Sequence, residues 1–236
     1  ESLRGVTIVQ LSDFHRGCGG TDDLIHEAIS RVNALSPEFI VLTGDFVNDC
    51  VEDILPVVRM VSGLRARRGV FAILGNHDHR ADPILLTSAL EAASIPVLHN
   101  RSVQIAEGLH LAGVDDLLEG DPSLSDALSR LPCDEAAIFL CHNPNGLDFV
   151  PNDLSLLLLA GHTHGGQIVL PFPSPQAVCR WHLRTRYVAG WYQRGRSRMY
   201  VNRGIGVTGS GFLARRINCR PEVSQFRLVP ENIGNR

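Results

Sequence analysis

The chain has 236 residues, of which 44% are hydrophobic and 20% are charged, and its formal net charge at pH 7 is −3. This composition is typical of a globular protein with a sizeable core, and the small net charge argues against a nucleic-acid binder that relies on an overall positive field. All 22 basic residues are arginines, which excludes mechanisms that need a lysine, such as a Schiff base or a P-loop.

Nothing in the sequence divides the chain into parts. It has no Ser-, Gly- or Pro-rich linker, no charge run and no internal repeat, and we therefore expect residues 1–236 to form a single domain. The cysteines form no C-x-x-C pair, which argues against a zinc site of four thiolates, and their scatter favours buried thiols over disulfides. They are Cys18, Cys50, Cys133, Cys141, Cys179 and Cys219.

Five apolar runs have the pattern of buried strands in an α/β fold, and each ends on side chains that can bind a metal. In chain order they are residues 5–13, ending at Asp13 with His15 just beyond; 38–46, reaching Asp45; 69–78, reaching Asn76 and His77; 136–144, reaching His142; and 154–164, ending at His162 and His164.

Helical patterns lie between the first of these runs, over residues 21–35, 52–64 and 82–94. The first has an apolar stripe with Thr21 or Asp22 as a candidate N-cap, and in the last Pro83 suits the first helical position. Alternation of strand and helix predicts right-handed βαβ units and a largely parallel sheet.

The second half of the chain has a different pattern. Residues 101–114 and 186–204 each predict a β-hairpin, and residues 222–229 predict a final short strand. We therefore expect more antiparallel structure after the parallel sheet, in two sheets packed face to face with helices outside.

The seven metal-capable side chains should converge, because ligands of open α/β sheets bind beyond the carboxyl ends of the strands. Carboxylate, imidazole and amide groups without a thiolate suit a divalent Mn, Fe or Zn ion. Seven ligands exceed what one tetrahedral ion uses, and with one bridging carboxylate they divide between two ions. The D-x-H and H-x-H spacings also let alternate side chains face one site.

The motifs SDFH, TGDF, GNHD, CHNP and GHTHGG, in this order, resemble those of the calcineurin-like metallophosphoesterases over roughly residues 6 to 170. Residues 187–206 and 220–228 are similar to a bacterial branch of membrane-associated phosphodiesterases and UDP-2,3-diacylglucosamine pyrophosphohydrolases. The resemblance implies an α/β fold with mixed sheets, arranged as a four-layer α/β/β/α sandwich. It also implies that Asp13, His15 and His164 hold one divalent ion, that Asn76, His142 and His162 hold the other, and that Asp45 bridges them.

Two ions about 3.5–4 Å apart can activate a bridging hydroxide for in-line attack on a phosphodiester or pyrophosphate bond, so that no protein nucleophile is needed. His77 is then the candidate that donates a proton to the leaving oxygen. In some family members an aspartate three residues after the bridging aspartate orients this histidine. This chain has Asn48 there, and we expect His77 to depend on Asp49 or Asp78 instead.

Other residues have weaker sequence signals for binding. Arg16, His79 and Arg80 are candidate contacts to the phosphate-ester substrate, which we expect to be linked to a lipid or a nucleotide. Residues 180–203 contain seven arginines, both tryptophans and all three tyrosines. This cluster suits a membrane surface, a nucleotide or a partner protein, with nucleic acid as a third choice, or else a hairpin with aromatic cross-strand pairs and solvated arginines.

Several alternatives remain at this point. The enzyme alternative is a generic phosphomonoesterase or nucleotide phosphodiesterase, and the others are a non-catalytic metal-binding scaffold and a redox di-metal protein. Gly165 and Gly166 are either turn residues or let the backbone approach a metal-bound phosphate. We expect a monomer of bacterial origin, associated with a membrane through an N-terminal anchor or signal missing from this sequence, and otherwise cytoplasmic.

Overall fold

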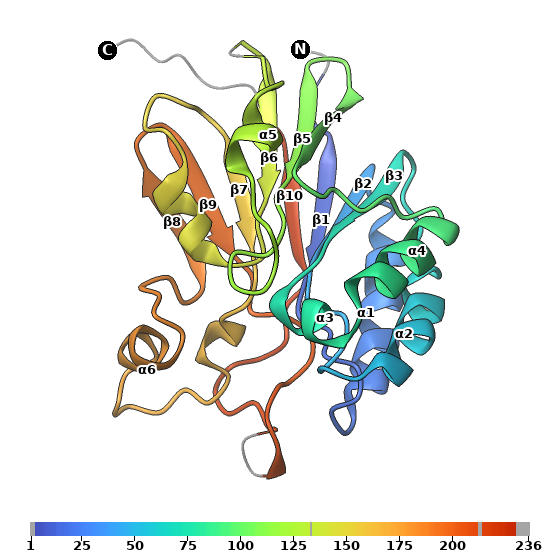
Figure 1. Cartoon of the computed structure of the whole chain (residues 1–236), viewed down its shortest axis with the longest axis vertical. Coiled ribbons are helices and arrows are strands. Elements are labelled where there is room, and N and C mark those ends of the chain that lie inside the picture. Colours follow the sequence, from blue (N-terminus) through green and yellow to red (C-terminus); the bar gives the residue numbers. More distant parts are fainter. Residues whose placement is uncertain (1–2, 133, 212–213, 230–236) are drawn as a thin grey trace.

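Two β-sheets lie face to face in the computed structural model of the chain, with helices on their outer faces (Figure 1). The structure describes residues 3–132, 134–211 and 214–229, so Cys133 lies outside the described residues. The first sheet has the strand order β10-β1-β2-β3. Its parallel strands are β1 (Thr7–Leu11), β2 (Phe39–Thr43) and β3 (Gly69–Ile73), and β10 (Ser224–Arg227) pairs antiparallel with β1.

The second sheet has the strand order β4-β5-β6-β7-β9-β8. Its strands are β4 (Arg101–Ala106), β5 (Leu109–Gly113), β6 (Ala136–Leu140), β7 (Leu157–Ala160), β8 (Gly190–Arg194) and β9 (Ser197–Val201). Both predicted hairpins are confirmed as β4-β5 and β8-β9. The second sheet is antiparallel only at these two edges, because β5, β6, β7 and β9 are parallel, and β10 adds an antiparallel pair in the first sheet. The expectation of more antiparallel structure in the second half is therefore confirmed. Each parallel pair requires a crossover that brings the chain back to the end of the sheet where the previous strand began, and these crossovers contain helical turns.

Three apolar cores separate the layers. Alternate residues of each inner strand face opposite sides, so Ile8 packs between the two sheets while Val9 packs under the helices of the first sheet. In the second sheet Ile138 faces the space between the sheets, and Phe139 faces the outer core. The predicted four-layer sandwich is therefore confirmed.

The helices that cover the first sheet lie where the sequence pattern predicts them. They are α1 (Thr21–Leu35), the 3₁₀ turn η1 (Val51–Asp53), α2 (Ile54–Val61) and α4 (Pro83–Ala92). Pro83 occupies the first turn of α4, and the Asp82 side chain caps it by accepting from Leu85 N at 2.9 Å. The predicted N-cap of α1 is wrong: Gly20 caps this helix in a left-handed conformation, and the Thr21 hydroxyl donates to Cys18 O instead.

The crossovers of the second half carry shorter elements. They are α5 (Leu124–Leu128), η2 (Pro144–Phe149), η3 (His164–Gly166) and α6 (Pro175–His182). A further short helix, α3 (Asn76–Ala81), follows β3 directly, so Asn76 and His77 lie in its first turn. In the part of the chain that the structure describes, no helix combines the length and the apolar character needed to cross a membrane.

Candidate metal centre

The predicted ligands follow the carboxyl ends of β1, β2, β3, β6 and β7, and five of them have an unusual backbone conformation. Positive φ angles of 44° to 72° occur at Asp13, His15, Asp45, His162 and His164. Residues other than glycine avoid this region, and such strain is concentrated where function requires a side chain to point in a particular direction. The turns after three strands are thus shaped to aim these groups.

Asp13, His15 and His164 form one buried group whose ligand atoms all lie within 4.8 Å of one another. The Nε2 atoms of the two histidines are 2.9 Å apart, and His164 Nε2 is 3.3 Å from Asp13 Oδ1. Burial and the neighbouring His15 hold the pKa of His164 well below its usual value, so its imidazole is neutral. A neutral imidazole and a carboxylate that face one point are suited to a divalent cation.

Asp45, His142 and His162 form a second buried group of the same compactness. His142 Nδ1 lies 2.7 Å from Thr43 O, which makes Nδ1 the protonated nitrogen and leaves Nε2 free to bind a metal. Burial acts to lower the pKa of His142, but the Asp45 carboxylate outweighs it and raises that pKa well above its usual value. The second group therefore attracts positive charge.

Three buried atoms near this second group have no hydrogen-bond partner in the described structure: Asn76 Oδ1, His142 Nε2 and His162 Nε2. Buried polar atoms are nearly always paired, and a cation would satisfy all three by accepting their lone pairs, in place of the proton that the Asp45 carboxylate favours on His142. These are the three residues assigned to the second ion by the resemblance. The residues present therefore fit a divalent cation.

Asp45 lies between the two groups. Its Oδ2 is 3.1 Å from His142 Nε2 and 3.4 Å from His15 Nε2, while its Oδ1 accepts from the backbone N–H of His77 at 2.9 Å. Burial acts to raise the pKa of Asp45, but the His142 and His15 imidazoles hold it well below its usual value. An ionised carboxylate with one oxygen facing both groups is placed as a bridge would be.

Asp78 holds the loop that carries Asp45 rather than orienting His77. Its Oδ2 accepts from the backbone N–H groups of Gly75 and Asp45 at 2.9 and 2.8 Å, and its Oδ1 accepts from those of Phe46 and Val47 at 2.7 and 3.2 Å. The side chain is buried, and burial together with the charge of Asp45 raises its pKa to about 7. Asp49 and Asp78 are the two aspartates expected to orient His77. Asp78 instead accepts hydrogen bonds from backbone N–H groups.

The other aspartate, Asp49, lies beside His77, with Oδ1 2.8 Å from His77 Nδ1. Asn48 does not face this histidine, because its Oδ1 accepts from the Thr208 hydroxyl at 3.2 Å. The His77 ring packs edge-on against His15, with ring centroids 4.6 Å apart. His77 also groups with His15 and Asp45 within 4.8 Å, so both a proton-transfer role and a ligand role are sterically open to it.

The three predicted substrate contacts are each paired with carboxylates. Arg16 forms ion pairs with Asp53 and Asp22, and Arg80 lies 3.4 Å from both Asp49 and Glu119. His79 Nε2 lies 2.7 Å from Asp115 Oδ1. Contact of these residues with substrate stays a prediction.

Arg216 was not predicted from the sequence as a residue of the site. Its half-buried guanidinium connects the HTHGG segment (residues 162–166) to the chain that follows β9. It donates to His164 O at 3.3 Å, to Arg203 O at 2.7 Å and to Gly206 O at 2.6 Å. No motif marks this arginine, and its neighbour in space is 52 residues away in sequence.

The glycines of this segment have a steric role. Gly165 and Gly166 have φ angles of 62° and 84°, as turn residues do. A Cβ at Gly165 would lie 2.9 Å from both Arg203 Cγ and Cys219 Sγ. The missing side chain therefore lets Arg203 and Cys219 pack directly against the backbone after His164.

Acidification should destabilise the metal-free protein through His162. Burial and the neighbouring His142 lower the pKa of His162 from 6.5 to about 3, so between these pH values the unfolded chain binds a proton that the folded chain does not. Its contribution to stability is complete above about pH 6.5 and is lost as the pH falls towards 3. Urea denaturation in the presence of a chelator should show a larger loss between pH 7.5 and 5 for the wild type than for His162→Gln. Equal losses in the two proteins would contradict this assignment.

Comparison with known proteins agrees with the site. The calcineurin-like phosphoesterase family matches residues 6–166. The uncharacterized metallophosphoesterase YkuE of Bacillus subtilis is 34% identical, with 97% of this chain and 80% of that protein covered. The phosphodiesterase YaeI of Escherichia coli is 33% identical, with 94% and 82% covered. UDP-2,3-diacylglucosamine pyrophosphatase LpxG of Chlamydia muridarum is 26% identical, with 97% and 85% covered.

A solved structure, TT1561 of Thermus thermophilus, shares the fold with a TM-score of 0.58 at 14% identity, over 85% of this chain and 90% of that one. Fold, site and relatives together define a metal-dependent phosphoesterase. The chain belongs to the calcineurin-like phosphoesterase family.

Proposed function

We propose that the protein is a binuclear metal phosphohydrolase that cleaves phosphodiester or pyrophosphate bonds. The observation that carries this proposal is the set of three buried ligand atoms of Asn76, His142 and His162 that make no hydrogen bond, beside a carboxylate that faces both ligand groups. Asp13, His15 and His164 would hold one ion, Asn76, His142 and His162 the other, and Asp45 both. Two divalent ions of Mn, Fe or Zn, when bound, supply an activated water and neutralise charge on the phosphoryl oxygens.

The chain itself supplies the proton for the leaving group. The His77 ring is half-buried beside His15, and Asp49 at 2.8 Å from Nδ1 favours protonation there and directs Nε2 towards the leaving oxygen. The Asp49 side chain is 42% exposed and also forms an ion pair with Arg80. Asp49 therefore orients the His77 ring but stabilises its protonated form only weakly. Burial lowers the pKa of His77 below its usual value, so donation from Nε2 would use the minor form of the imidazole in which both nitrogens are protonated.

The relatives' names support the bond type. One related protein is named a phosphodiesterase and another a UDP-2,3-diacylglucosamine pyrophosphatase, and we extend this to a lipid- or nucleotide-linked substrate here. A generic phosphomonoesterase is the alternative within the same chemistry. A non-catalytic metal-binding scaffold would need the same buried ligands, and it would differ from an enzyme by binding metal without hydrolysing a phosphate ester.

The test measures bound metal and hydrolysis of bis-p-nitrophenyl phosphate with added Mn²⁺. We expect close to two ions for each chain and turnover that a chelator abolishes. Absence of both metal and turnover would refute the proposal. A redox di-metal protein would instead change its absorption spectrum on exposure to air, without hydrolysing the ester.

His77→Ala should lower kcat by about 10²-fold or more while the metal content stays at the wild-type value, because general acid catalysis contributes this much. Elemental analysis and steady-state kinetics on the same preparation decide the point. Asp49→Asn should give a smaller loss and shift the pH profile. If His77→Ala instead lost metal, His77 would be a ligand.

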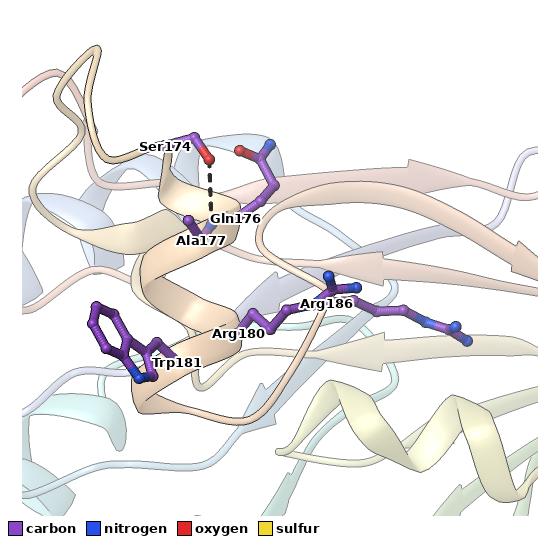
Figure 2. A pocket seen from close by; sticks show the side chains of 6 residues that line it. All are labelled: Ser174, Gln176, Ala177, Arg180, Trp181 and Arg186. Atoms are coloured by element: carbon purple, nitrogen blue, oxygen red, sulfur yellow. Dashed lines mark hydrogen bonds between the residues drawn. The ribbon is translucent and has the colours of Figure 1, made fainter.

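We also propose that α6 and the loop before it meet an anionic membrane surface. Phe172 and Trp181 are 89% and 86% exposed, far more than large apolar side chains usually are. Figure 2 shows Trp181 projecting from α6 on one side and Arg180 extending towards Arg186 on the other. Exposed aromatic residues beside arginines suit the interface of an anionic bilayer.

Only part of the predicted Arg- and aromatic-rich 180–203 segment is available for this surface. Trp191 pairs across the hairpin with Tyr200 at 5.1 Å, and Tyr187 packs against Tyr192 at 4.9 Å in the outer core. The hairpin alternative therefore accounts for the ring contacts of these four residues, of which Trp191 is still 57% exposed, and the membrane proposal rests on Phe172 and Trp181.

Sedimentation with vesicles of phosphatidylcholine containing about one third phosphatidylglycerol tests this surface. The double variant Phe172→Ser/Trp181→Ser should bind roughly tenfold or more weakly. Ile84→Ser, which removes a 78% exposed side chain from α4, is the control and should bind as the wild type does. Equal binding by all three proteins would contradict the proposal.

A further inference from the structure

The loop after β1 has a strained backbone that other parts of the chain must hold in place. Asp13 and His15 have φ angles of 52° and 44°. Conformations of this kind persist only where the surrounding structure fixes them. Asp78 fixes the turns after β2 and β3 through its four backbone N–H partners. The loop after β1 is instead held by a later segment of the chain.

This segment consists of residues 202–206, which follow β9 directly. Two of its backbone N–H groups donate to the carbonyl oxygens of Ser12 and Asp13, at 3.0 and 2.7 Å. Gly204 lets the two segments touch, because a Cβ there would lie only 2.5 Å from Asp13 Cβ. The position of Asp13 therefore depends on where the 202–206 segment lies.

Arg216 connects the 202–206 segment to a second ligand of the same ion. Its Nε and Nη2 both donate to Gly206 O, at 2.8 and 2.6 Å, and Nη2 also donates to Arg203 O at 2.7 Å. Its Nη1 donates to His164 O at 3.3 Å. A guanidinium is planar and its donors point in fixed directions, so one side chain sets the positions of all three carbonyl groups relative to one another.

The partners of Arg216 indicate a structural link and not a charge pair. Besides the three carbonyl oxygens, its nitrogens lie 3.8 Å from Cys219 Sγ and 3.4 Å from His164 Nδ1. Among the residues that the structure describes, no carboxylate forms an ion pair with it. Arginines that act through their charge are usually paired with carboxylate or phosphate groups. The Cys219 thiol also donates to His164 O, at 3.1 Å, and so supports the same carbonyl.

We propose that Arg216 is a positioning residue for the first ion, the one assigned to Asp13, His15 and His164. It holds His164 against the segment that packs on Asp13, so ligands from the two sheets stay at binding distance. In the described structure none of its contacts is to a ligand of the second ion. The inference rests on the proposed function and deepens it, because it predicts that the two ions depend on different residues.

Calorimetric titration with Mn²⁺ tests this role without using turnover. In Arg216→Ala one ion should bind about 10- to 100-fold more weakly, as is usual when a residue that orients a metal ligand is lost, and the other should bind as in the wild type. Arg216→Lys should recover part of the loss, because an ammonium group cannot span three carbonyls. Arg101→Ala is the control, since Arg101 donates only to a carbonyl remote from the ligands, Val97 O at 2.7 Å, and both ions should bind normally.

Asn76→Ala identifies which ion is affected. This variant lacks a ligand of the second ion and should keep one tightly bound ion, which Arg216→Ala in the same chain should weaken by the same 10- to 100-fold. An unchanged affinity in that double variant would overturn the inference. Electron paramagnetic resonance adds a spectroscopic reading, because Arg216→Ala with one equivalent of Mn²⁺ should show an isolated ion.

Urea denaturation establishes that the compared variants are folded. If Arg216→Ala does not fold, Arg216→Lys takes its place, and wild-type affinity for both ions in that variant would overturn the inference. Equal weakening of both ions in a folded Arg216 variant would overturn it too. A wild type that binds fewer than two ions would refute the binuclear centre itself, whereas two normal ions in every Arg216 variant would refute only the role of Arg216.

Discussion

Asp45→Asn should abolish hydrolysis, with kcat/KM lower by at least about 10³-fold, and should reduce bound metal to one ion or fewer for each chain. The carboxylate lies between the ligand groups, 3.1 Å from His142 Nε2 and 3.4 Å from His15 Nε2. An amide has the same shape but no charge, and its nitrogen cannot bind a cation. Metal analysis and kinetics on bis-p-nitrophenyl phosphate measure both effects.

The fold should survive this substitution, because the amide oxygen of the new side chain can still accept from the His77 N–H that Asp45 Oδ1 now accepts. Far-ultraviolet circular dichroism provides the check. Asp49→Asn is the matched control, since Asp49 contacts His77 but no candidate ligand atom of the second group. A fully active Asp45→Asn protein that holds two ions would rule out the bridging role.

Asp78→Ala should lower the free energy of unfolding by at least about 3 kcal/mol, because it leaves several buried backbone N–H groups without acceptors. The carboxylate accepts from four such groups, belonging to Gly75, Asp45, Phe46 and Val47. Together they fix the turns after β2 and β3, which carry Asp45 and Asn76. Urea denaturation measures the loss, and metal content should fall with it.

Asp78→Asn separates charge from hydrogen bonding, since its amide keeps one acceptor oxygen and should recover only part of the stability. Glu27→Ala removes another carboxylate, one that is 56% exposed in an i,i+4 pair with Arg31, and should cost about 0.5 kcal/mol or less. If Asp78→Ala were as stable as Glu27→Ala, the carboxylate would not hold these turns.

Much of the fold is visible in the sequence because strands and helices have local patterns. The five apolar runs before Asp13, Asp45, Asn76, His142 and His162 are strands, and residues 21–35 form α1 from end to end. The pattern predicted the first residue of α1 correctly but not its N-cap, which is Gly20 in a left-handed conformation and not a polar side chain. It did not show that β5, β6, β7 and β9 run parallel, because strand direction depends on crossovers and not on the residues of the strand.

The sequence by itself determined which residue types end the strands, and therefore the candidate ligands and the family. Only the tertiary structure decided their partners: Asp49 and not Asn48 beside His77, Asp78 on the backbone, and Arg216 against His164. It also placed Arg203 on Gly165. Local spacing records which face of a strand or helix a residue occupies, whereas contacts between residues tens of positions apart depend on how the two sheets pack.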